Sequence, residues 1–448
     1  MIKFNNDIMK KKISIELNKY IPGGCHTYSK ADNQFPDNAP QAILRGKGCY
    51  VIGVDNVRYL DCGMGLSSVS IGHANKYINS KVKKEIENGT NFNRPALLEL
   101  NVAKKFLELV PKHQMIKFAK NGSTITTAAV KLARAYTGRD YIAYPKEHFF
   151  YSYDDWFMSK QECNSGTLSE IAKKTLTFKQ CDLESLKELF RKNKGKIAAI
   201  IMEPEKNYCN TSCDCKIKVS DYLKKAQKII KKNGALFILD EMVTGFKTNL
   251  PGSSTKYDLD PDMTTWGKGI ANGYSFCALT GKKKYMELGG LKQKHSPRVF
   301  LISSTHGAET TAMAAFLATL KMFKEKNIIY KNMRYLNSLT KICENLIFKY
   351  GLEQNIKLTK SNWLLSFTFL EKKKISLRLK TLFMQEMIEN KVLFQGFFIP
   401  CFSHSSAELK IFVRAFEKSA SIVKKSFKFG IEKYLKSKIV KPIFSKFN

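Results

Sequence analysis

The segment from residue 196 to residue 240 constrains the fold most, because two apolar runs flank an amphipathic stretch. The first run, residues 196–202, ends at Glu203, and the second, residues 235–239, ends at Asp240. Between them, apolar residues recur at three- and four-residue spacing with lysines on the opposite face and Gly234 as a stop: Leu223, Ala226, Ile229 and Ile230. The pattern predicts two buried parallel strands joined by a helix over residues 220–232. In such an α/β sheet, ligands bind at the carboxyl ends of the strands.

A second strand and helix are indicated upstream. Residues 141–144 are typical of a strand, and the stretch before them predicts a helix closed by Gly138. That helix begins at the turn Asn121-Gly122-Ser123, where small residues and free backbone N–H groups suit a phosphate. Taken alone, Ser123 is equally typical of an ordinary helix N-cap.

Lys268 lies between two glycines, 28 residues after Asp240. A lysine in such a turn is uninformative by itself in a lysine-rich chain. An acid at a strand end followed at this distance by a lysine is more telling, since the acid can protonate a pyridine ring and the lysine can form an imine with the ring's aldehyde. The pair suggests a pyridoxal phosphate enzyme.

Composition is typical of a cytoplasmic globular enzyme. The chain has 448 residues, 44% of them hydrophobic, enough for about two or three packed domains. Eleven irregularly spaced cysteines and no secretory signal favour reduced thiols. No apolar run approaches the roughly 20 residues that a membrane span needs.

The net charge of +36 invites a nucleic-acid or membrane partner. Most basic residues are lysines spread along the chain, however, and no nucleic-acid-binding motif accompanies them. We therefore expect no nucleic-acid partner. The densest lysine stretch is the C-terminal tail, where an acidic-partner surface and a solvated helix face both remain open.

Two further clusters have more than one interpretation. Residues 147–156 are rich in aromatics, which can stack on a cofactor ring or fill the core. The cluster Cys209, Cys213 and Cys215 lacks a second Cys or His pair, so we interpret it as a loop and expect no metal site.

The motifs together resemble the class III aminotransferases, in the branch similar to glutamate-1-semialdehyde aminomutase, several members of which are associated with cell-surface polysaccharide synthesis. The order and spacing of these segments match over nearly the whole chain up to about residue 425. The segments are Asn121-Gly122-Ser123, Met202-Glu203-Pro204, residues 239–246, Gly267-Lys268 and residues 304–309.

The resemblance implies an α/β enzyme of fold type I, with a large domain around a mostly parallel seven-stranded sheet and a small α+β domain built from both chain ends. We expect residues 1–60 to contribute to the small domain, 61–312 to form the large domain, 313–425 to complete the small one and 426–448 to be a basic tail. It also implies a homodimer with active sites shared between subunits.

The resemblance further assigns roles by motif. Lys268 would bind pyridoxal 5'-phosphate as an imine, with pyridoxamine 5'-phosphate as the alternate form, and Asp240 would pair with the ring nitrogen. The other expected cofactor contacts are Gly122, Ser123 and Thr124 at the phosphate, Phe150 and Met242 on the two ring faces, Glu203 nearby, and Thr305 reaching the neighbouring subunit's phosphate. Arg94, in the loop of residues 91–95, is the candidate for binding a donor carboxylate.

Some positions depart from the family pattern. Thr124 stands where an acid is frequent, and Phe150-Tyr151-Ser152 replaces a usual Tyr-His-Gly. The aminomutase itself has a glycine-rich stretch after its lysine, where this chain has residues 269–274. These differences favour transamination from an amino acid to a keto or aldehydo acceptor, such as a surface glycan precursor. The aminomutase reaction and a catalytically inactive basic binding protein on the same fold are the alternatives.

Overall fold

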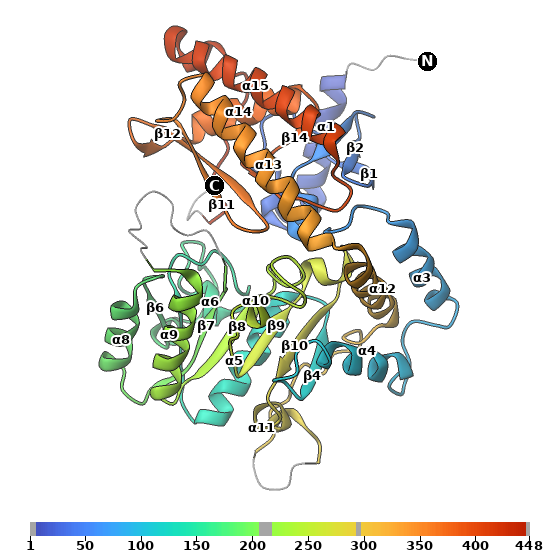
Figure 1. Cartoon of the computed structure of the whole chain (residues 1–448), viewed down its shortest axis with the longest axis vertical. Helices are drawn as coiled ribbons and strands as arrows, with labels where there is room; N and C mark the ends of the chain where they lie inside the picture. Colours follow the sequence, from blue (N-terminus) through green and yellow to red (C-terminus); the bar gives the residue numbers. More distant parts are fainter. Residues whose placement is uncertain (1–5, 206–216, 293–296, 445–448) are drawn as a thin grey trace. The chain divides into compact units, whose positions relative to one another are not determined.

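The computed structural model describes residues 6–205, 217–292 and 297–444. The chain forms two compact units (Figure 1). The larger unit comprises residues 67–69 and 76–329, and the smaller one takes its residues from the chain up to Leu66, from residues 70–75 and from Tyr330 onward. Within the described ranges, no helix is both long and apolar enough to cross a membrane.

A seven-stranded sheet forms the centre of the larger unit, in the order β4-β10-β9-β8-β7-β5-β6. Strand β10 runs antiparallel to both of its neighbours, and the other four strand pairs are parallel. The expected mostly parallel seven-stranded sheet is therefore confirmed. The strands are β4 (Met115–Ala119), β5 (Tyr141–Pro145), β6 (Thr175–Phe178), β7 (Ile197–Met202), β8 (Leu236–Glu241), β9 (Met263–Trp266) and β10 (Cys277–Gly281).

The strand–helix–strand prediction for residues 196–240 is confirmed. Strands β7 and β8 are buried at every residue and pair in parallel, and helix α9 (Val219–Lys232) connects them. Gly234, just past the helix end, has a φ of 67°, which a residue without a side chain adopts at little cost. Strand β8 extends further than expected, so Asp240 is its last residue but one.

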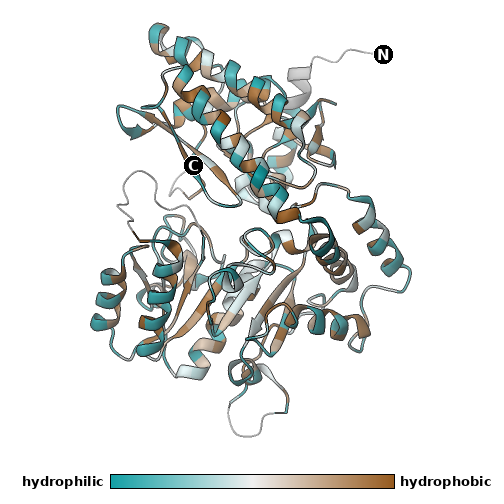
Figure 2. Cartoon of the chain, viewed as in Figure 1, coloured by the Kyte–Doolittle hydropathy of each residue, from teal (hydrophilic) through white to brown (hydrophobic). Residues whose placement is uncertain are grey.

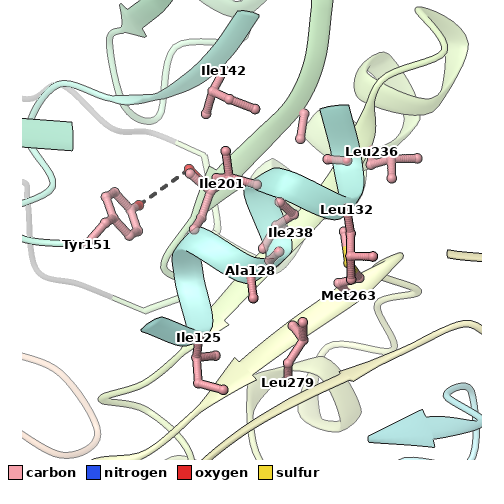
Figure 3. Packing of buried hydrophobic residues seen from close by; sticks show 14 of the residues in the cluster. Ile125, Ala128, Leu132, Ile142, Tyr151, Ile201, Leu236, Ile238, Met263 and Leu279 are labelled. Atoms are coloured by element: carbon pink, nitrogen blue, oxygen red, sulfur yellow. Dashed lines mark hydrogen bonds between the residues drawn. The ribbon is translucent and has the colours of Figure 1, made fainter. Parts of the chain in front are cut away.

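Helix α5 (Gly122–Thr137) covers one face of this sheet and ends at Gly138, as predicted. Figure 3 shows Ile125, Ala128 and Leu132 of α5 directed at strand side chains such as Ile201 and Ile238. Helices α8 (Leu183–Lys192) and α9 pack on the other face through a separate cluster of buried residues. Both helices carry lysines on the outer side, which gives them one hydrophilic and one hydrophobic face in Figure 2. The sheet is thus buried on both faces.

The remaining helices of the larger unit are short or lie beside strand β4. Helix α12 packs against α3, α4 and η4, so the larger unit continues past the expected boundary at residue 312. These helices are α3 (Lys76–Ile86), α4 (Leu97–Leu107), α6 (Asp155–Met158), α7 (Ser169–Lys173), α10 (Ser253–Lys256), η4 (Lys268–Ala271), α11 (Lys283–Met286), η5 (Glu287–Gly289) and α12 (Thr310–Lys326).

Among its described residues, the smaller unit contains two small sheets and four helices of 13 residues or more. Strands β1, β2, β3 and β14 form one sheet, and β11, β12, β13 and β15 form the other. The strands are β1 (Ile43–Lys47), β2 (Tyr50–Gly53), β3 (Arg58–Asp61), β11 (Ile356–Lys360), β12 (Leu365–Glu371), β13 (Lys374–Ile375), β14 (Val392–Leu393) and β15 (Phe397–Phe398). The helices are α1 (Asn6–Tyr20), η1 (Pro22–Gly24), η2 (Tyr28–Lys30), η3 (Asp32–Gln34), α13 (Ile328–Lys349), α14 (Leu377–Glu389), α15 (Ser406–Phe429) and η6 (Ile431–Lys433). The first two residues of α13 belong to the larger unit. The turn α2 (Met64–Ser67) connects the two units along the chain.

The segment expected to be a basic tail from residue 426 is in fact part of the smaller unit. Helix α15 continues to Phe429, because its buried side also includes Ser426. Beyond it, the backbone N–H of Lys436 donates to Gln385 Oε1 at 2.8 Å, and that of Val440 donates to Thr381 Oγ1 at 3.1 Å. The segment is therefore hydrogen-bonded to α14, although many of its lysines remain solvated.

Replacing Val440 with aspartate should destabilise the smaller unit, because Val440 is only 4% exposed. Burying a carboxylate there should lower the free energy of unfolding by at least about 2 kcal/mol. The neighbouring change Ile439→Asp is the matched control, since Ile439 is 48% exposed and should tolerate the charge. Chemical denaturation of both variants measures the difference, and equal effects would mean that the segment does not pack as described.

Candidate active site

Lys268 begins the short helix η4 directly after strand β9. Its backbone φ is 48°, in the left-handed region that residues with side chains rarely adopt. The three residues that follow it in η4 are buried, whereas Lys268 itself is only half-buried. Backbone strain of this kind persists where the surrounding structure holds it in place, and it is frequent at functional sites. The lysine is thus held rigidly while its side chain stays accessible.

Met242 brings the Lys268 segment close to the start of helix α5. A Cβ atom at Gly267 would lie 2.1 Å from Met242 Sδ, and one at Gly122 would lie 3.1 Å from the same sulfur. Any larger residue at Gly267 would displace Met242, which is itself buried. The two glycines therefore allow the backbones on both sides to approach a single methionine side chain.

Asp240 lies near the end of strand β8 and is 3% exposed. The register between β8 and β9 pairs it with Thr265, whose hydroxyl donates to Asp240 Oδ1 at 2.7 Å. The backbone N–H of Met242 donates to the same oxygen at 2.8 Å. Among the described residues Oδ2 accepts no hydrogen bond, so this oxygen can accept one from a ligand.

The pKa of Asp240 is raised to about 6, mainly by burial and then by the nearby charge of Glu203. The hydrogen bonds from Thr265 and Met242 and the charge of Lys268 oppose this shift. A carboxyl group in these surroundings gains most from a cation that replaces the lost hydration. The protonated nitrogen of a pyridine ring is such a cation.

Glu203 follows strand β7 directly and is also buried. Its backbone N–H lies 3.3 Å from His148 Nδ1 and 3.2 Å from Tyr151 Oη, and the side chains of His148 and Tyr151 are hydrogen-bonded to each other. The Tyr151 hydroxyl also donates to the carbonyl of Ile201 at 3.4 Å, drawn as a dashed line in Figure 3. Burial and the charges of Glu203 and Asp240 raise the pKa of Tyr151, so its hydroxyl stays neutral.

The aromatic stretch of residues 147–156 contains both buried and exposed rings. Tyr151 and Trp156 are buried in the core together with Phe157. Phe150, in contrast, is 41% exposed and meets Phe157 edge-on, with ring centroids 5.8 Å apart. Phe150 can therefore offer a ring face to a ligand, while its neighbours fill the interior.

The N-cap of helix α5 is Asn121 and not Ser123. The Asn121 side chain accepts from the backbone N–H of Thr124 at 2.9 Å and from its hydroxyl at 3.0 Å. Ser123 is buried, and its hydroxyl accepts from the backbone N–H of Tyr153 at 3.1 Å, which ties the aromatic loop to the helix start. The N–H groups in the first turn of a helix have no partner within the helix, so they favour an anion at this end.

Thr305 and Arg94 lie on two exposed loops that contact each other. Thr310 donates from its hydroxyl to the carbonyl of Gly89 at 3.1 Å, and Asn91 Nδ2 lies 3.5 Å from His306 Nδ1. Both Thr305 and Arg94 are exposed. No described contact joins either residue to Lys268 or Asp240.

The described residues contain no group of three or more His, Cys, Asp or Glu side chains that could hold a metal ion. The cysteine cluster Cys209, Cys213 and Cys215 lies outside the described residues. Its interpretation as a loop stays a prediction.

Two residues of the site escaped sequence reasoning. Thr265 occupies a uniformly buried strand, and only the register with β8 places its hydroxyl on Asp240. Tyr151 lies next to Phe150 in an aromatic run, where nothing in the spacing separates the buried ring from the exposed one. The only signal in the sequence is that both residues carry a hydroxyl group. Thr265 stands three residues before Lys268, and Tyr151 stands within the aromatic run.

These features fit pyridoxal phosphate. A buried acid with an open oxygen suits a pyridinium, a half-buried lysine suits an aldehyde, and a glycine-bearing helix start suits a phosphate. The three groups lie at the carboxyl ends of neighbouring strands or at the helix that packs on them, which is where an α/β sheet binds ligands.

Comparison with known proteins supports the same conclusion. The family model for class III aminotransferases matches residues 33–357. The glutamate-1-semialdehyde 2,1-aminomutase of Francisella philomiragia is 32% identical over 337 residues, covering 73% of this chain and 75% of that protein. The 3-aminobutyryl-CoA aminotransferase of Cloacimonas acidaminovorans is 28% identical over 419 residues, covering 92% and 96%.

Solved structures share the fold. The FumI protein of a Sphingopyxis species, in a pyridoxal phosphate-bound form, superposes with a TM-score of 0.84 at 21% identity, covering 96% of this chain and 98% of that one. A glutamate-1-semialdehyde aminomutase from Pseudomonas aeruginosa, in complex with pyridoxamine phosphate, gives 0.79 at 15% identity, covering 93% and 95%. Since the family model spans most of the chain, this protein belongs to the class III aminotransferases, which are pyridoxal phosphate-dependent enzymes of fold type I.

Proposed function

We propose that this enzyme transfers an amino group between two substrates, with Lys268 and Asp240 as its catalytic residues. The observation that carries the proposal is the buried Asp240 carboxylate, which has one oxygen open to a ligand and lies on the strand next to the one that leads into Lys268. Burying a carboxylate lowers the stability of the fold unless a cationic partner compensates for the lost hydration.

The cofactor contacts follow from the same arrangement. The start of helix α5 would bind the phosphate, supported by the N–H groups in its first turn. Phe150 would stack on the ring, since its side chain is partly exposed, and Met242 would pack against the opposite face. The proposed set is Gly122, Ser123, Thr124, Phe150, Glu203, Asp240, Met242 and Lys268, with Thr305 serving the neighbouring subunit's site.

When bound, the cofactor supplies an electron-withdrawing ring that stabilises negative charge on the substrate carbon. Asp240 would keep the ring nitrogen protonated, because a nearby carboxylate strengthens proton binding at a pyridine nitrogen. Thr265 and the Met242 backbone orient the carboxylate through Oδ1. Glu203 and Tyr151 form the buried surroundings that keep water from Asp240.

Lys268 performs two tasks in turn. Its amine would hold the cofactor through the aldehyde, with loss of water, until a donor amine takes its place. The freed amine of Lys268 would then be the base that removes a proton from the substrate carbon and carries it to the cofactor side. The left-handed backbone conformation at Lys268 sets the direction in which its side chain leaves the main chain.

An aminomutase is the second candidate, favoured by relatives of that name at 32% identity. Against it, the segment after Lys268 is a packed turn, with Ile270 and Ala271 buried and Tyr274 Oη bonded to Asn79 Oδ1 at 3.1 Å. Incubating the enzyme with a panel of amino acids and keto or aldehydo acceptors separates the two reactions. A transaminase consumes a donor, whereas a mutase rearranges one substrate without any donor.

We further propose a cytoplasmic homodimer whose acceptor is a precursor of a surface polysaccharide. The exposed Thr305 loop supports a shared site, because the loop leaves its hydroxyl accessible to a second subunit. The eight described cysteines are free thiols, which supports a reducing compartment. An inactive binding protein is disfavoured because Lys268 and Asp240 are both present.

Replacing Lys268 with alanine should abolish covalent attachment of pyridoxal phosphate and lower transamination by more than about a hundredfold. Borohydride reduction followed by peptide mass spectrometry measures the attachment. The variant Lys117→Ala is the control and should keep both properties, because Lys117 is the exposed residue of strand β4. Attachment at another lysine, or turnover within about tenfold of the parent, would contradict the assignment.

Replacing Asp240 with asparagine should stabilise the cofactor-free protein while it lowers turnover by orders of magnitude. The folded pKa of about 6 exceeds the ordinary 3.8, so folding becomes less favourable as pH rises from about 4 to about 6. The variant should gain up to about 3 kcal/mol above pH 7 and nothing below pH 4.

Urea denaturation at several pH values measures this difference. Asp258→Asn is the control, because Asp258 is exposed and paired with Lys112, and its loss should give no such gain. A stability difference for Asp240→Asn that does not change with pH would show that this carboxyl is not strained in the cofactor-free fold.

Replacing Arg94 with alanine should raise the apparent KM for an amino donor that carries a carboxylate by about tenfold to a hundredfold, since a charge-assisted pair is lost. A donor amine without a carboxylate should keep its KM. Steady-state kinetics with such a pair of donors tests the idea. Equal effects on both donors would instead indicate a role in folding the loop.

A further inference from the structure

Glu241 is a buried acid that the proposed reaction does not use. It is the last residue of β8, directly after Asp240, and it is fully buried. Successive side chains of a strand point to opposite faces, so the two carboxylates leave the sheet in opposite directions. The pKa of Glu241 is raised to about 7, mainly by burial, and this cost to the fold has to be offset by contacts.

Those contacts come from both ends of the loop that follows β8, residues 242–254. Thr244 donates from its hydroxyl to Glu241 Oε2, and the backbone N–H of Ser254 donates to Oε1 at 2.9 Å. Gly252 lies against the same group, because a Cβ atom there would be 2.7 Å from the carboxyl carbon and from both oxygens. One side chain therefore joins the beginning of the loop to its end.

The loop packs on the segment of Lys268. A Cβ atom at Gly245 would lie 3.1 Å from Trp266 Cε3 and 3.4 Å from Ile270 Cγ2, and these two residues stand on either side of Lys268 in the sequence. Met242, at the start of the loop, packs on the glycine that precedes Lys268. The loop thus contacts the chain both before and after the lysine.

These contacts explain how the backbone of Lys268 keeps its left-handed conformation. A φ of 48° is unfavourable for a residue with a side chain, and it persists where the surroundings hold it. Trp266 and Ile270 are both fully buried, so the loop meets fixed residues on each side of the lysine. Whatever restrains the loop therefore also restrains Lys268.

Glu205 supports the end of the loop independently of Glu241. Its Oε1 accepts from Lys256 Nζ at 2.9 Å and from Ser253 Oγ at 3.4 Å, and both donors belong to α10. Loss of the Glu241 carboxylate should therefore loosen the loop without unfolding it, because the bonds to Glu205 keep α10 in place.

We propose that Glu241 is a positioning residue of the active site: its carboxylate closes the loop of residues 242–254, and the closed loop holds the Lys268 backbone in its left-handed conformation. Glu241 acts through the loop and not by contact with the reacting atoms. The inference rests on the proposed role of Lys268, but the link between the carboxylate and the lysine can be measured without cofactor.

Hydrogen exchange of the cofactor-free protein, followed by peptide mass spectrometry, measures this link. In Glu241→Ala, the amides of residues 242–254 and 266–271 should exchange at least about tenfold faster than in the parent. Glu241→Gln should stay near the parent, because its amide can accept from the Ser254 N–H and donate to the Thr244 hydroxyl oxygen. Unchanged exchange at residues 266–271 in Glu241→Ala would overturn the proposal.

Asp262→Ala is the matched control. Asp262 is also a buried acid, and it accepts from the backbone N–H of Phe237 at 2.8 Å, but it precedes strand β9 whereas Lys268 follows that strand. This variant should lose stability and leave exchange at residues 266–271 near the parent rate. Equal acceleration there in both alanine variants would mean that Glu241 acts only through overall stability, which would also overturn the proposal.

Gly252→Ala reaches the same carboxylate from the loop side, and it serves as a second probe if Glu241→Ala fails to fold. In the parent, the added methyl group should displace the carboxylate and speed exchange at residues 266–271. Combined with Glu241→Ala, it should add little, because the carboxylate is already gone. Fully additive effects would show that the carboxylate is not the link.

Borohydride trapping of added pyridoxal phosphate connects the link to the lysine's chemistry. In Glu241→Ala, trapping should still occur at Lys268, at a rate at least about threefold below the parent. An unchanged rate despite faster exchange would overturn the positioning role. Trapping of the parent at another lysine would instead refute the proposed function, and the exchange rates would still show whether Glu241 holds the Lys268 backbone.

Discussion

The register between strands β8 and β9 is the constraint on which the site depends. It sets Asp240 opposite Thr265, so the carboxylate is bonded through one oxygen by the next strand. The same strand β9 then leads, after Gly267, into Lys268. Slipping the register by one residue would turn these side chains to the other face of the sheet. Backbone pairing of the two strands therefore places the acid and the lysine near each other. The register of this pairing is fixed because both strands are buried at every residue.

Close packing around Met242 adds a second level of order. The methionine fills the space that glycine leaves at Gly267 and Gly122, so the lysine segment and the start of helix α5 share one contact. Methionine is flexible and suits an irregular gap of this kind. In the same region, burial and the charge of Glu203 raise the pKa values of Tyr151 and Asp240. The site therefore combines tight packing with buried polar groups that lower the stability of the fold. Active sites commonly sacrifice stability for function in this way.

Local patterns in the sequence were sufficient to predict the strands β7 and β8, helix α9 and the end of α5, since each has a clear period and a glycine stop. The sequence left Ser123 open as an N-cap of α5, and the structure shows Asn121 in that place, because both residues have capping side chains and only the three-dimensional turn decides between them. Thr265 and Tyr151 could not be found, because the place of Thr265 comes from the strand register and that of Tyr151 from its burial. Within the expected basic tail, Val440 is buried and hydrogen-bonded to the distant Thr381, which the surrounding lysines give no sign of.

The joining of the two ends of the smaller unit has a consequence for how the chain folds. Gln34 Nε2 donates to the carbonyl of Lys441 at 3.0 Å, and the backbone N–H of Asp37 donates to Ser437 Oγ at 3.1 Å, contacts that span 407 and 400 residues. During synthesis, the strands and helices of the larger unit emerge in one continuous stretch and can pack as they appear. Residues before 66 cannot complete these contacts until the segment beyond residue 430 has been made. The ribosome-bound chain therefore carries an unfinished unit for most of its synthesis, and this unit is where a chaperone would be needed.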